Sequence, residues 1–204
     1  MSDGVRLALT FDAEHPDHPH CPPGNAERIL DALGEVGARA TFFIQGRWAQ
    51  SDPAIAERIA ADGHLIGNHS KYHARMTLLT DDGIRTDVRE SEQTIRDLTG
   101  VDPRPWFRCP FGDGSDDPRV LRALEGIGYR NVHWQVEALD WDAERDSEDV
   151  ERITLEGIAG HGDGAVVLMH TWPGSTGDAL PRILKQLAEE GAQFAAVDEL
   201  ESLP

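Results

Sequence analysis

The sequence contains few cysteines and no long apolar segment. Its two cysteines, Cys21 and Cys109, are too few for a disulfide framework. No apolar run approaches the roughly 20 residues that a membrane-spanning helix needs, and residues 1–4 lack the basic and apolar segments of a signal peptide. We therefore expect a protein that does not cross a membrane. It is expected to be cytoplasmic as the sequence stands, or secreted if the chain is a trimmed domain.

Basic residues are also scarce. The chain has 19 Lys and Arg against 37 Asp and Glu, which gives a formal net charge of −18. Nucleic acids and anionic membranes would repel such a chain, so neither is an expected partner. The composition is otherwise that of a globular protein, and we expect residues 1–204 to form one domain with a substantial core. The sequence leaves the oligomeric state open.

Short apolar runs alternate with amphipathic stretches along the chain. The apolar runs predict strands over residues 5–11, 40–44, 64–67, 105–108, 131–136, 165–169 and 193–197. Apolar residues three or four apart predict helices over residues 26–36 (with Asn25 as the cap), 84–98, 118–125, 147–158 and 179–190, and Pro53 marks the start of another. This alternation favours an α/β fold with parallel strands. Seven such units predict a barrel, whose chemistry lies at the C-terminal strand ends. No glycine-rich phosphate loop follows the first strand, which argues against a nucleotide-binding sheet.

Side chains that can do chemistry follow five of the predicted strands. They are Asp12 and Glu14 after the first strand, His69 and His73 after the third, Arg108 after the fourth, Asp140 after the fifth and His170 after the sixth. If each residue is considered alone, the simplest interpretation of Arg108 is a residue at the rim, and that of His170 is a histidine in the core. Five such endings at the same end of a barrel instead indicate a catalytic site.

Two histidines have the spacing of metal ligands. His69 and His73 are four residues apart, so on a helical turn both imidazoles share a face and can bind one ion. An isolated pair at this spacing is more often part of a surface helix. An acid from another strand end changes that interpretation, because zinc binds two histidines and one carboxylate and leaves a position for water. We interpret the other histidines as structural or exposed: His15, His18, His20, His64, His133 and His161. For His18 and His20, stray metal binding is an alternative.

Five segments, in chain order, resemble the motifs of carbohydrate esterase family 4, the polysaccharide deacetylases. Thr10-Phe11-Asp12 is similar to the start of a Thr-Phe-Asp-Asp-Gly motif, and His69-Ser70-Lys71-Tyr72-His73 matches His-Ser/Thr-x-x-His. Arg108-Cys109-Pro110-Phe111-Gly112 is similar to Arg-Pro-Pro-Tyr-Gly. Asp140-Trp141 matches the end of the fourth motif, and Leu168-Met169-His170 is similar to a Leu-x-His fifth motif. The resemblance covers nearly the whole chain.

This resemblance implies a distorted (β/α) barrel with seven or eight parallel strands and its active site at the C-terminal strand ends. The implied reaction is metal-dependent hydrolysis of an N-acetyl group on a sugar or glycan. In the implied roles, Asp12 is the general base and Arg108 keeps it ionised. His170 is the acid that protonates the departing amine, and Asp140 orients or tunes His170.

The resemblance also implies a metal site and a substrate site. His69 and His73 bind one divalent ion, with zinc preferred and cobalt or nickel as alternatives that the same ligands accept. The backbone N–H of Phe111 helps to hold the oxyanion, and Trp141 and Leu168 form the wall of the acetyl pocket. The expected partner is therefore an N-acetylated sugar or glycan.

The sequence departs from the family pattern at the third metal ligand. Ala13 stands where the pattern has its second Asp, and Glu14 stands where the pattern has Gly. Alanine cannot bind a metal ion. Residues i and i+2 of a strand point to the same side, so Asp12 and Glu14 can both face the site. We predict that Asp12 does chemistry and that Glu14 binds the metal, with His15 as the alternative ligand.

Two other functions compete with deacetylation of a sugar. The first keeps the mechanism and changes the substrate to a non-sugar amide, such as a cyclic imide or ureide. The second is a metal-free pseudoenzyme that binds glycans or partners, with Ala13 as its signature. The retained acids, histidines and arginine argue against the pseudoenzyme, because an inactive site has no physical use for the full set.

Overall fold

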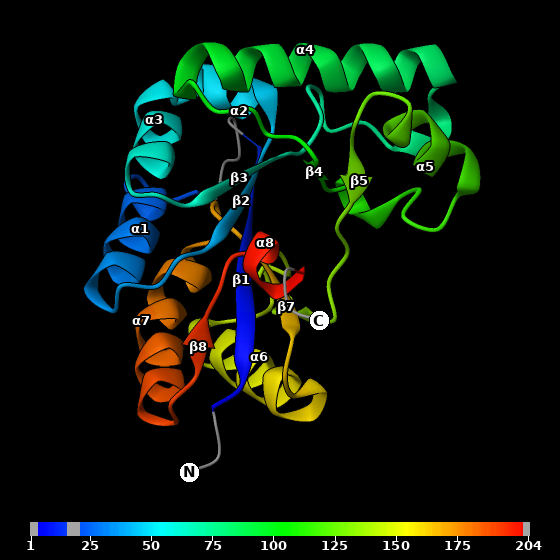
Figure 1. The fold of residues 1–204 in the computed structure, drawn as a ribbon. Coiled ribbons are helices and arrows are strands. Elements are labelled where there is room, and N and C mark those ends of the chain that lie inside the picture. The colour runs from blue at the N-terminus through cyan, green and yellow to red at the C-terminus, as the bar shows by residue number, and fades with distance from the viewer. Residues whose placement is uncertain (1–3, 16–20, 202–204) are drawn as a thin grey trace.

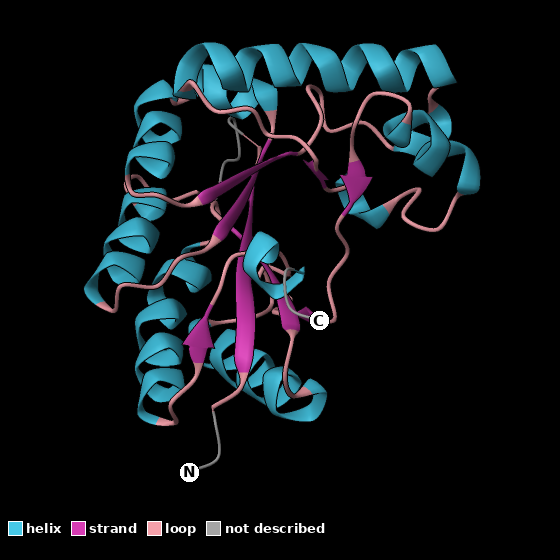
Figure 2. Cartoon of the chain, viewed as in Figure 1, coloured by secondary structure: helices cyan, strands magenta, loops and turns pink. Residues whose placement is uncertain are grey.

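The structure, a computed structural model, describes residues 4–15 and 21–201 (Figures 1 and 2). Its strands are β1 (Arg6–Ala13), β2 (Thr41–Ile44), β3 (Leu65–Asn68), β4 (Trp106–Phe107), β5 (Arg130–Asn131), β6 (Val136–Glu137), β7 (Ala165–His170) and β8 (Gln193–Phe194). Its α-helices are α1 (Asn25–Glu35), α2 (Gly46–Ser51), α3 (Pro53–Ala61), α4 (Asp81–Thr99), α5 (Pro118–Glu125), α6 (Ser147–His161), α7 (Gly174–Glu189) and α8 (Val197–Glu201). The described residues also form two 3-10 helices, η1 (Met76–Leu78) and η2 (Pro110–Gly112).

The strands form one parallel sheet that curls around an interior (Figure 1). Their order is β5-β4-β3-β2-β1-β7-β6, and β8 pairs with the start of β1. Because the paired strands are parallel, their C-terminal ends lie at the same end of the sheet. The predicted α/β barrel of seven or eight parallel strands is confirmed.

The strand predicted over residues 131–136 is wrong. The segment forms two short strands, β5 and β6, at opposite edges of the strand order. The N–H of Val132 still donates to Phe107 of β4, at 2.7 Å, whereas the N–H of Gln135 donates to Val166 of β7, at 3.0 Å. The backbone of residues 132–135 therefore crosses the interior from β4 to β7. This change of pairing partner depends on the whole sheet, so the local apolar pattern could not predict it.

The alternating side chains of β1 divide the core into an outer and an inner part. Leu7, Leu9, Phe11 and Ala13 belong to the outer cluster that also contains buried residues of α1, α3, α6 and α7. The inner cluster contains Ala8 and apolar residues from β2, β4, the segment after β5 and α8, which are Phe43, Trp106, Val132 and Val197. In Figure 1, α1, α3 and α7 lie along one side of the sheet and α4 lies across its top. Both faces of β1 are thus buried, which explains its nearly continuous apolar sequence.

The C-terminal helix α8 helps to fill the interior. It contributes Val197, and Leu200 packs against the same cluster. Arg39, just before β2, bonds Asp198 of α8 at 2.8 Å, which places α8 at the N-terminal strand ends. The strand predicted over residues 193–197 ends early, because Val197 begins this helix. The interior is thereby closed at the end opposite the C-terminal strand ends.

Most predicted helices are present with the expected end signals. Thr80 accepts a hydrogen bond from Gly83 N–H at the start of α4, which ends at Gly100 with a φ of 71°. Pro53 is at the first position of α3. The prediction that Asn25 caps the first helix is wrong, because Gly24 is the N-cap and Asn25 makes no capping bond. The Asn25 amide instead donates to the carbonyls of Thr171 and Pro173, at 2.8 and 2.9 Å.

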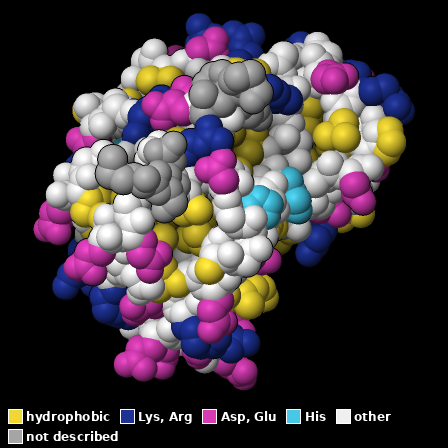
Figure 3. All heavy atoms as spheres, turned by 60° about the horizontal axis from the view of Figure 1, so that its bottom comes forward, with side chains coloured by type: hydrophobic (Ala, Val, Ile, Leu, Met, Phe, Trp, Pro, Cys, Tyr) yellow, Lys and Arg dark blue, Asp and Glu magenta, His cyan; other side chains and the backbone are white. Residues whose placement is uncertain are grey.

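Among the described residues, no helix is both long and apolar enough to span a membrane. On the face drawn in Figure 3, Lys and Arg side chains lie among Asp and Glu rather than in one basic area. His18 and His20 lie outside the described residues.

Candidate active site

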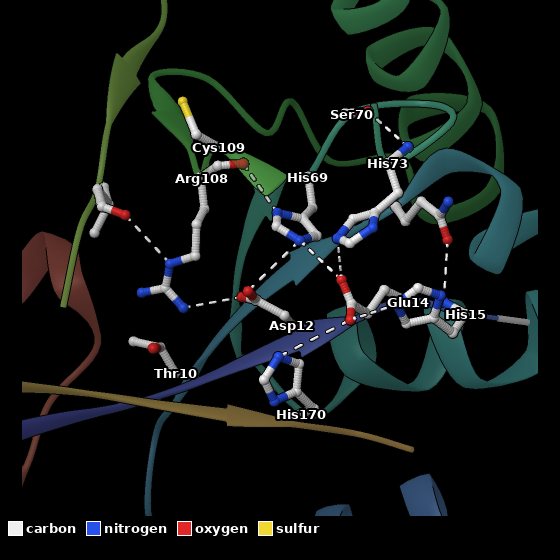
Figure 4. A network of polar contacts seen from close by, with 12 residues as sticks. Thr10, Asp12, Glu14, His15, His69, Ser70, His73, Arg108, Cys109 and His170 are labelled. Atoms are coloured by element: carbon white, nitrogen blue, oxygen red, sulfur yellow. Dashed lines mark hydrogen bonds and ion pairs between the residues drawn. The ribbon is translucent and has the colours of Figure 1, made fainter. Parts of the chain in front are cut away.

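The predicted site residues converge at the C-terminal ends of the strands (Figure 4). Asp12 is near the end of β1, and its register partner on β7 is His170. Its partner on the other side is Phe43 of β2. Glu14 follows β1 directly, and the Glu14 side chain points back toward the same centre as Asp12. The predicted alternation is therefore present, with both acids facing the site.

Ala13 points the other way. Its side chain is fully buried in the outer core cluster with Phe11 and Ile44. The position where the family pattern has a metal-binding Asp is thus directed into apolar packing in this chain. Glu14 is the acid that reaches the centre.

Three side chains bring potential metal-ligand atoms together. One ligand atom from each of Glu14, His69 and His73 lies within 4.8 Å of the other two. Nε2 of His69 is 3.1 Å from Oε2 of Glu14, and Nε2 of His73 faces the same oxygen. Nδ1 of His69 lies 2.9 Å from the carbonyl of Arg108, which only accepts, so Nδ1 carries a proton and Nε2 is the nitrogen directed toward the cluster. Figure 4 shows the three side chains pointing toward one another.

The two histidines reach this arrangement without a helix. The expected helical turn is wrong, because residues 69–75 form a loop in which Ser70 and His73 have φ angles of 68° and 57°. The side chain of Asp87 on α4 accepts hydrogen bonds from the N–H groups of Lys71 and Tyr72, at 3.0 and 3.2 Å. The Ser70 hydroxyl accepts from His73 N–H at 2.9 Å. Side-chain bonds to the backbone therefore fix a loop that brings the two imidazoles together.

The donor set fits a divalent metal ion. Two imidazole nitrogens and a carboxylate oxygen are ligands that zinc, cobalt and nickel accept. Nε2 of His73 is buried and faces Oε2 of Glu14, the oxygen that Nε2 of His69 also faces. A divalent cation would accept these three atoms as ligands.

Electrostatics at the cluster also favour a cation. Burial raises the pKa of the Glu14 carboxyl, but hydrogen bonds from His15, His69 and His73 outweigh it and hold that pKa well below its usual range. Burial lowers the pKa of His69, but the Asp12 and Glu14 carboxylates raise it overall. Burial lowers the pKa of His73. Glu14 is thus ionised and can serve as an anionic ligand.

Asp12 is held by a buried arginine. Nη1 of Arg108 donates to Oδ1 of Asp12 at 2.9 Å, and Nε of Arg108 donates to the carbonyl of Val132 at 3.2 Å. Arg108 is 0% exposed, and its guanidinium lies 4.1 Å from the centre of the Phe43 ring. Oδ2 of Asp12 lies 3.5 Å from Nε2 of His69, beside the metal ligands. The arginine therefore leaves one carboxylate oxygen directed toward the cluster.

His170 and Asp140 form a second buried pair. Nδ1 of His170 is 2.7 Å from Oδ1 of Asp140, and the backbone N–H of His170 donates to Oδ2 of Asp140 at 2.7 Å. The Thr176 hydroxyl also donates to that oxygen, at 2.6 Å. Burial lowers the pKa of His170, but Asp140 raises it to about 9 overall. The pair leaves Nε2 of a cationic imidazole facing the cavity.

Asp12, Glu14, His73 and His170 line a cavity of about 460 Å³. Its lining includes the three predicted substrate-contacting residues Phe111, Trp141 and Leu168. Phe111 and Trp141 are 56% and 49% exposed, so they form the rim, whereas Leu168 is buried. Phe111 has a φ of 59° inside η2, an unusual conformation for a non-glycine residue and one that is typical of functional sites.

Comparison with known proteins agrees with this geometry. A family model described as polysaccharide deacetylase matches residues 2–132, which is more than half of the chain. The chain belongs to the polysaccharide deacetylase family. It is similar to the peptidoglycan-N-acetylglucosamine deacetylase of Bacillus cereus, with 31% identity over 200 residues that cover 96% of this chain and 68% of that protein.

Solved structures of polysaccharide deacetylases have the same fold. A family 4 carbohydrate esterase from Streptomyces lividans, in complex with acetate, matches with a TM-score of 0.78 and 29% identity, over 94% of this chain and 91% of that chain. A family pseudoenzyme from Bacillus anthracis matches with a TM-score of 0.84 and 26% identity, over 98% of this chain and 66% of that chain. Similarity of fold within the family thus extends to a protein described as inactive.

The prediction from the sequence motifs of this polysaccharide deacetylase did not include several residues that lie at the site. Arg75, Trp134 and Trp172 line the cavity, and Thr176 bonds Asp140. Arg75 and Trp172 each follow a predicted site histidine by two residues, a spacing that could have indicated them. Trp134 lies in the segment where one continuous strand was predicted, and Thr176 lies in the first turn of α7.

Proposed function

We propose that this polysaccharide deacetylase is a metal-dependent hydrolase that removes N-acetyl groups from an N-acetylated sugar or glycan. The observation that carries the proposal is the convergence of Glu14, His69 and His73 beside a cavity that His170 also lines. A metal-ligand set, a carboxylate beside it and an acid that lines the same cavity are the groups that amide hydrolysis requires.

Glu14, His69 and His73 would hold one divalent ion, with zinc as the preferred metal and cobalt or nickel as alternatives. When bound, such an ion polarises the amide carbonyl and lowers the pKa of a coordinated water. The protein groups around the cavity then position the substrate and move the protons.

Asp12 is proposed to accept the proton of the attacking water. Its Oδ1 is bonded to Arg108, so Oδ2, on the side of the metal ligands, is the oxygen that takes the proton. Arg108 cannot lose its charge under ordinary conditions and therefore keeps the carboxylate in place. Asp12 is not needed as a ligand, because Glu14 provides the carboxylate oxygen that lies between the two imidazoles.

His170 is proposed to protonate the departing amine, which cannot leave as an anion. Asp140 holds Nδ1, so the proton is delivered from Nε2 on the cavity side. The raised pKa of His170 keeps the imidazole cationic at neutral pH. The backbone N–H of Phe111 would meet the charge that develops on the carbonyl oxygen, and Trp141 and Leu168 would contact the acetyl group and the sugar.

The substrate class rests on the cavity and on the relatives. Aromatic rings at an exposed rim suit the apolar faces of sugar rings, and the similar Bacillus cereus protein is a peptidoglycan-N-acetylglucosamine deacetylase. Among the described residues that line the cavity, none favours a cyclic imide or ureide over an acetamido sugar. Retention of Asp12, Arg108, Asp140 and His170 in one connected arrangement argues against a pseudoenzyme.

The test separates the proposed base from the proposed ligand. Asp12→Asn should keep the metal content near that of the parent and lower acetate release from N-acetylglucosamine oligomers by roughly 10²–10⁴-fold. Glu14→Ala should weaken metal binding first, and added zinc should restore part of the rate. Glu137→Gln removes a different cavity carboxylate and should retain the metal, so it is the matched control.

Three outcomes would change the assignment. Full activity after complete metal removal would refute a metalloenzyme. Metal loss in Asp12→Asn, with tight binding in Glu14→Ala, would exchange the two roles. Ring opening of cyclic imides without acetate release would replace the sugar substrate, and inactivity of the metal-loaded parent on both substrate classes would support the pseudoenzyme.

A further inference from the structure

The two carboxylate oxygens of Glu14 have different neighbours. Oε2 faces Nε2 of His69 and Nε2 of His73. Oε1 lies 3.0 Å from Nε2 of His15 and accepts a hydrogen bond from Nε1 of Trp172 at 3.3 Å. Nε2 of His170 lies farther from Oε1, at 3.9 Å, and Glu14 is 4% exposed. One oxygen is therefore directed to the metal-ligand cluster, and the other is directed away from it, toward His15, Trp172 and His170; Figure 4 shows His15 and His170 on this side of the carboxylate.

The contact with Trp172 shows which oxygen is available to a metal ion. The indole nitrogen only donates and cannot bind a cation. An oxygen that accepts from it is turned away from the cluster, and the carboxylate plane is fixed by that bond. Glutamate has one more rotatable bond than aspartate, so a ligand at position 14 needs more external restraint than an aspartate would.

The two donors are themselves held by separate parts of the fold. Trp172 lies between Thr171 and Pro173, whose carbonyls both accept from the amide of Asn25, which is buried at the start of α1. The N–H of Thr171 donates to the carbonyl of Asp12 at 3.2 Å. On the other side, the backbone N–H of His15 donates to Oε1 of Gln45 at 3.2 Å. The two restraints on Glu14 therefore come from the start of α1 and from the start of α2.

We infer that Trp172 and His15 are positioning residues that fix Glu14 so that only Oε2 faces the two histidines. This inference rests on the proposed metal site and deepens it, because it explains how a glutamate can serve where Ala13 has no ligand. Residues that orient a metal ligand in this way typically contribute 10–100-fold to metal affinity. The role requires neither side chain to touch the metal or the substrate.

The experiment measures zinc affinity of the full chain by competition with a chelator, and records the absorption spectrum of the cobalt-loaded protein. Trp172→Phe keeps an aromatic ring and removes the donor, so zinc should bind about 10–100-fold more weakly and the cobalt spectrum should change. Trp141→Phe removes an indole from the same cavity without contact to Glu14, and should leave affinity and spectrum unchanged. Thermal unfolding of the metal-free variants checks that each is folded.

Variants at His15 test the second donor independently. His15→Ala should weaken zinc binding about 10-fold, whereas His15→Gln retains an N–H donor and should recover most of the affinity. Parent-like affinity and an unchanged cobalt spectrum in Trp172→Phe would overturn the inference while leaving the metal site intact. Loss of binding in His15→Ala as complete as in His69→Ala would make His15 a ligand and overturn its positioning role. A parent that binds no divalent ion would overturn both the inference and the proposed function.

Discussion

The ion pair between Asp12 and Arg108 is buried, so its removal gives a sharp prediction about stability. Both residues lie almost completely out of water, with Arg108 0% and Asp12 4% exposed. Arg108→Met preserves much of the volume of the side chain but removes its charge. The Asp12 carboxylate then loses the Nη1 bond at 2.9 Å and stays buried with one cationic neighbour fewer.

The size of the effect follows from the geometry. At an effective dielectric constant of about 20, opposite charges separated by 2.9 Å attract by about 6 kcal/mol before desolvation is counted. Breaking a buried pair by removing one partner typically costs about 3–5 kcal/mol. His69 lies 3.5 Å from Asp12 and compensates in part, so we expect about 3 kcal/mol, at the lower end of that range. For a chain of this length, that corresponds to a decrease in Tm of about 6–12 °C.

A double-mutant cycle separates the charge from the packing. Urea and thermal unfolding of the metal-free protein would be compared for the parent, Arg108→Met, Asp12→Asn and the double variant. If the ion pair is responsible, Arg108→Met should cost much less in the Asp12→Asn background, with a coupling free energy of about 2–3 kcal/mol. A coupling below about 0.5 kcal/mol would refute the reasoning, and would assign the cost to lost contacts of Arg108 with Phe43.

Two further predictions concern His170 and Ala13. The pKa of His170 is raised to about 9, so in the metal-free protein its stabilisation is complete below the unfolded value near 6.5 and is lost as the pH rises through 9. The stability difference between the parent and Asp140→Asn, measured by urea unfolding, should therefore shrink from pH 6 to pH 10, and a constant difference would contradict the assignment. Ala13→Asp places a carboxylate in the outer core, so it should lower Tm and fail to restore zinc binding to Glu14→Ala. Parent-like zinc affinity in that double variant would show that the β1 backbone can rotate.

The barrel was predictable because its signals are local. Buried parallel strands are continuous apolar runs, and helix ends carry Thr80 or Gly100 at positions where a cap is needed. The change of partner between β5 and β6 was not predictable, because it depends on which edges of the sheet are open. The same holds for Asn25, whose side chain bonds two carbonyls near position 172 instead of its own helix.

The predicted site residues come together in the structure, but the means of positioning them could not be read from spacing. The four-residue interval between His69 and His73 predicted a helical turn, and a loop with two positive φ angles brings the imidazoles together instead. Asp87 holds that loop from α4 and belongs to none of the motifs. Restraints of this kind link residues far apart in the chain, and a single sequence does not display them.

Asp12 on β1 and His170 on β7 are register partners. This pairing has a consequence for how the substrate specificity of such a protein can change. The separation between the two backbones is that of neighbouring strands, about 4.8 Å, and hydrogen bonds along the whole strand pair maintain it. The exposed rim side chains of Phe111 and Trp141 belong to neither strand. Substitution of these two side chains can therefore alter which molecule is admitted while the backbones of the proposed proton-transfer pair keep their spacing, provided that Asp140, which bonds His170, is retained. The rim side chains are thus the place to engineer a new specificity.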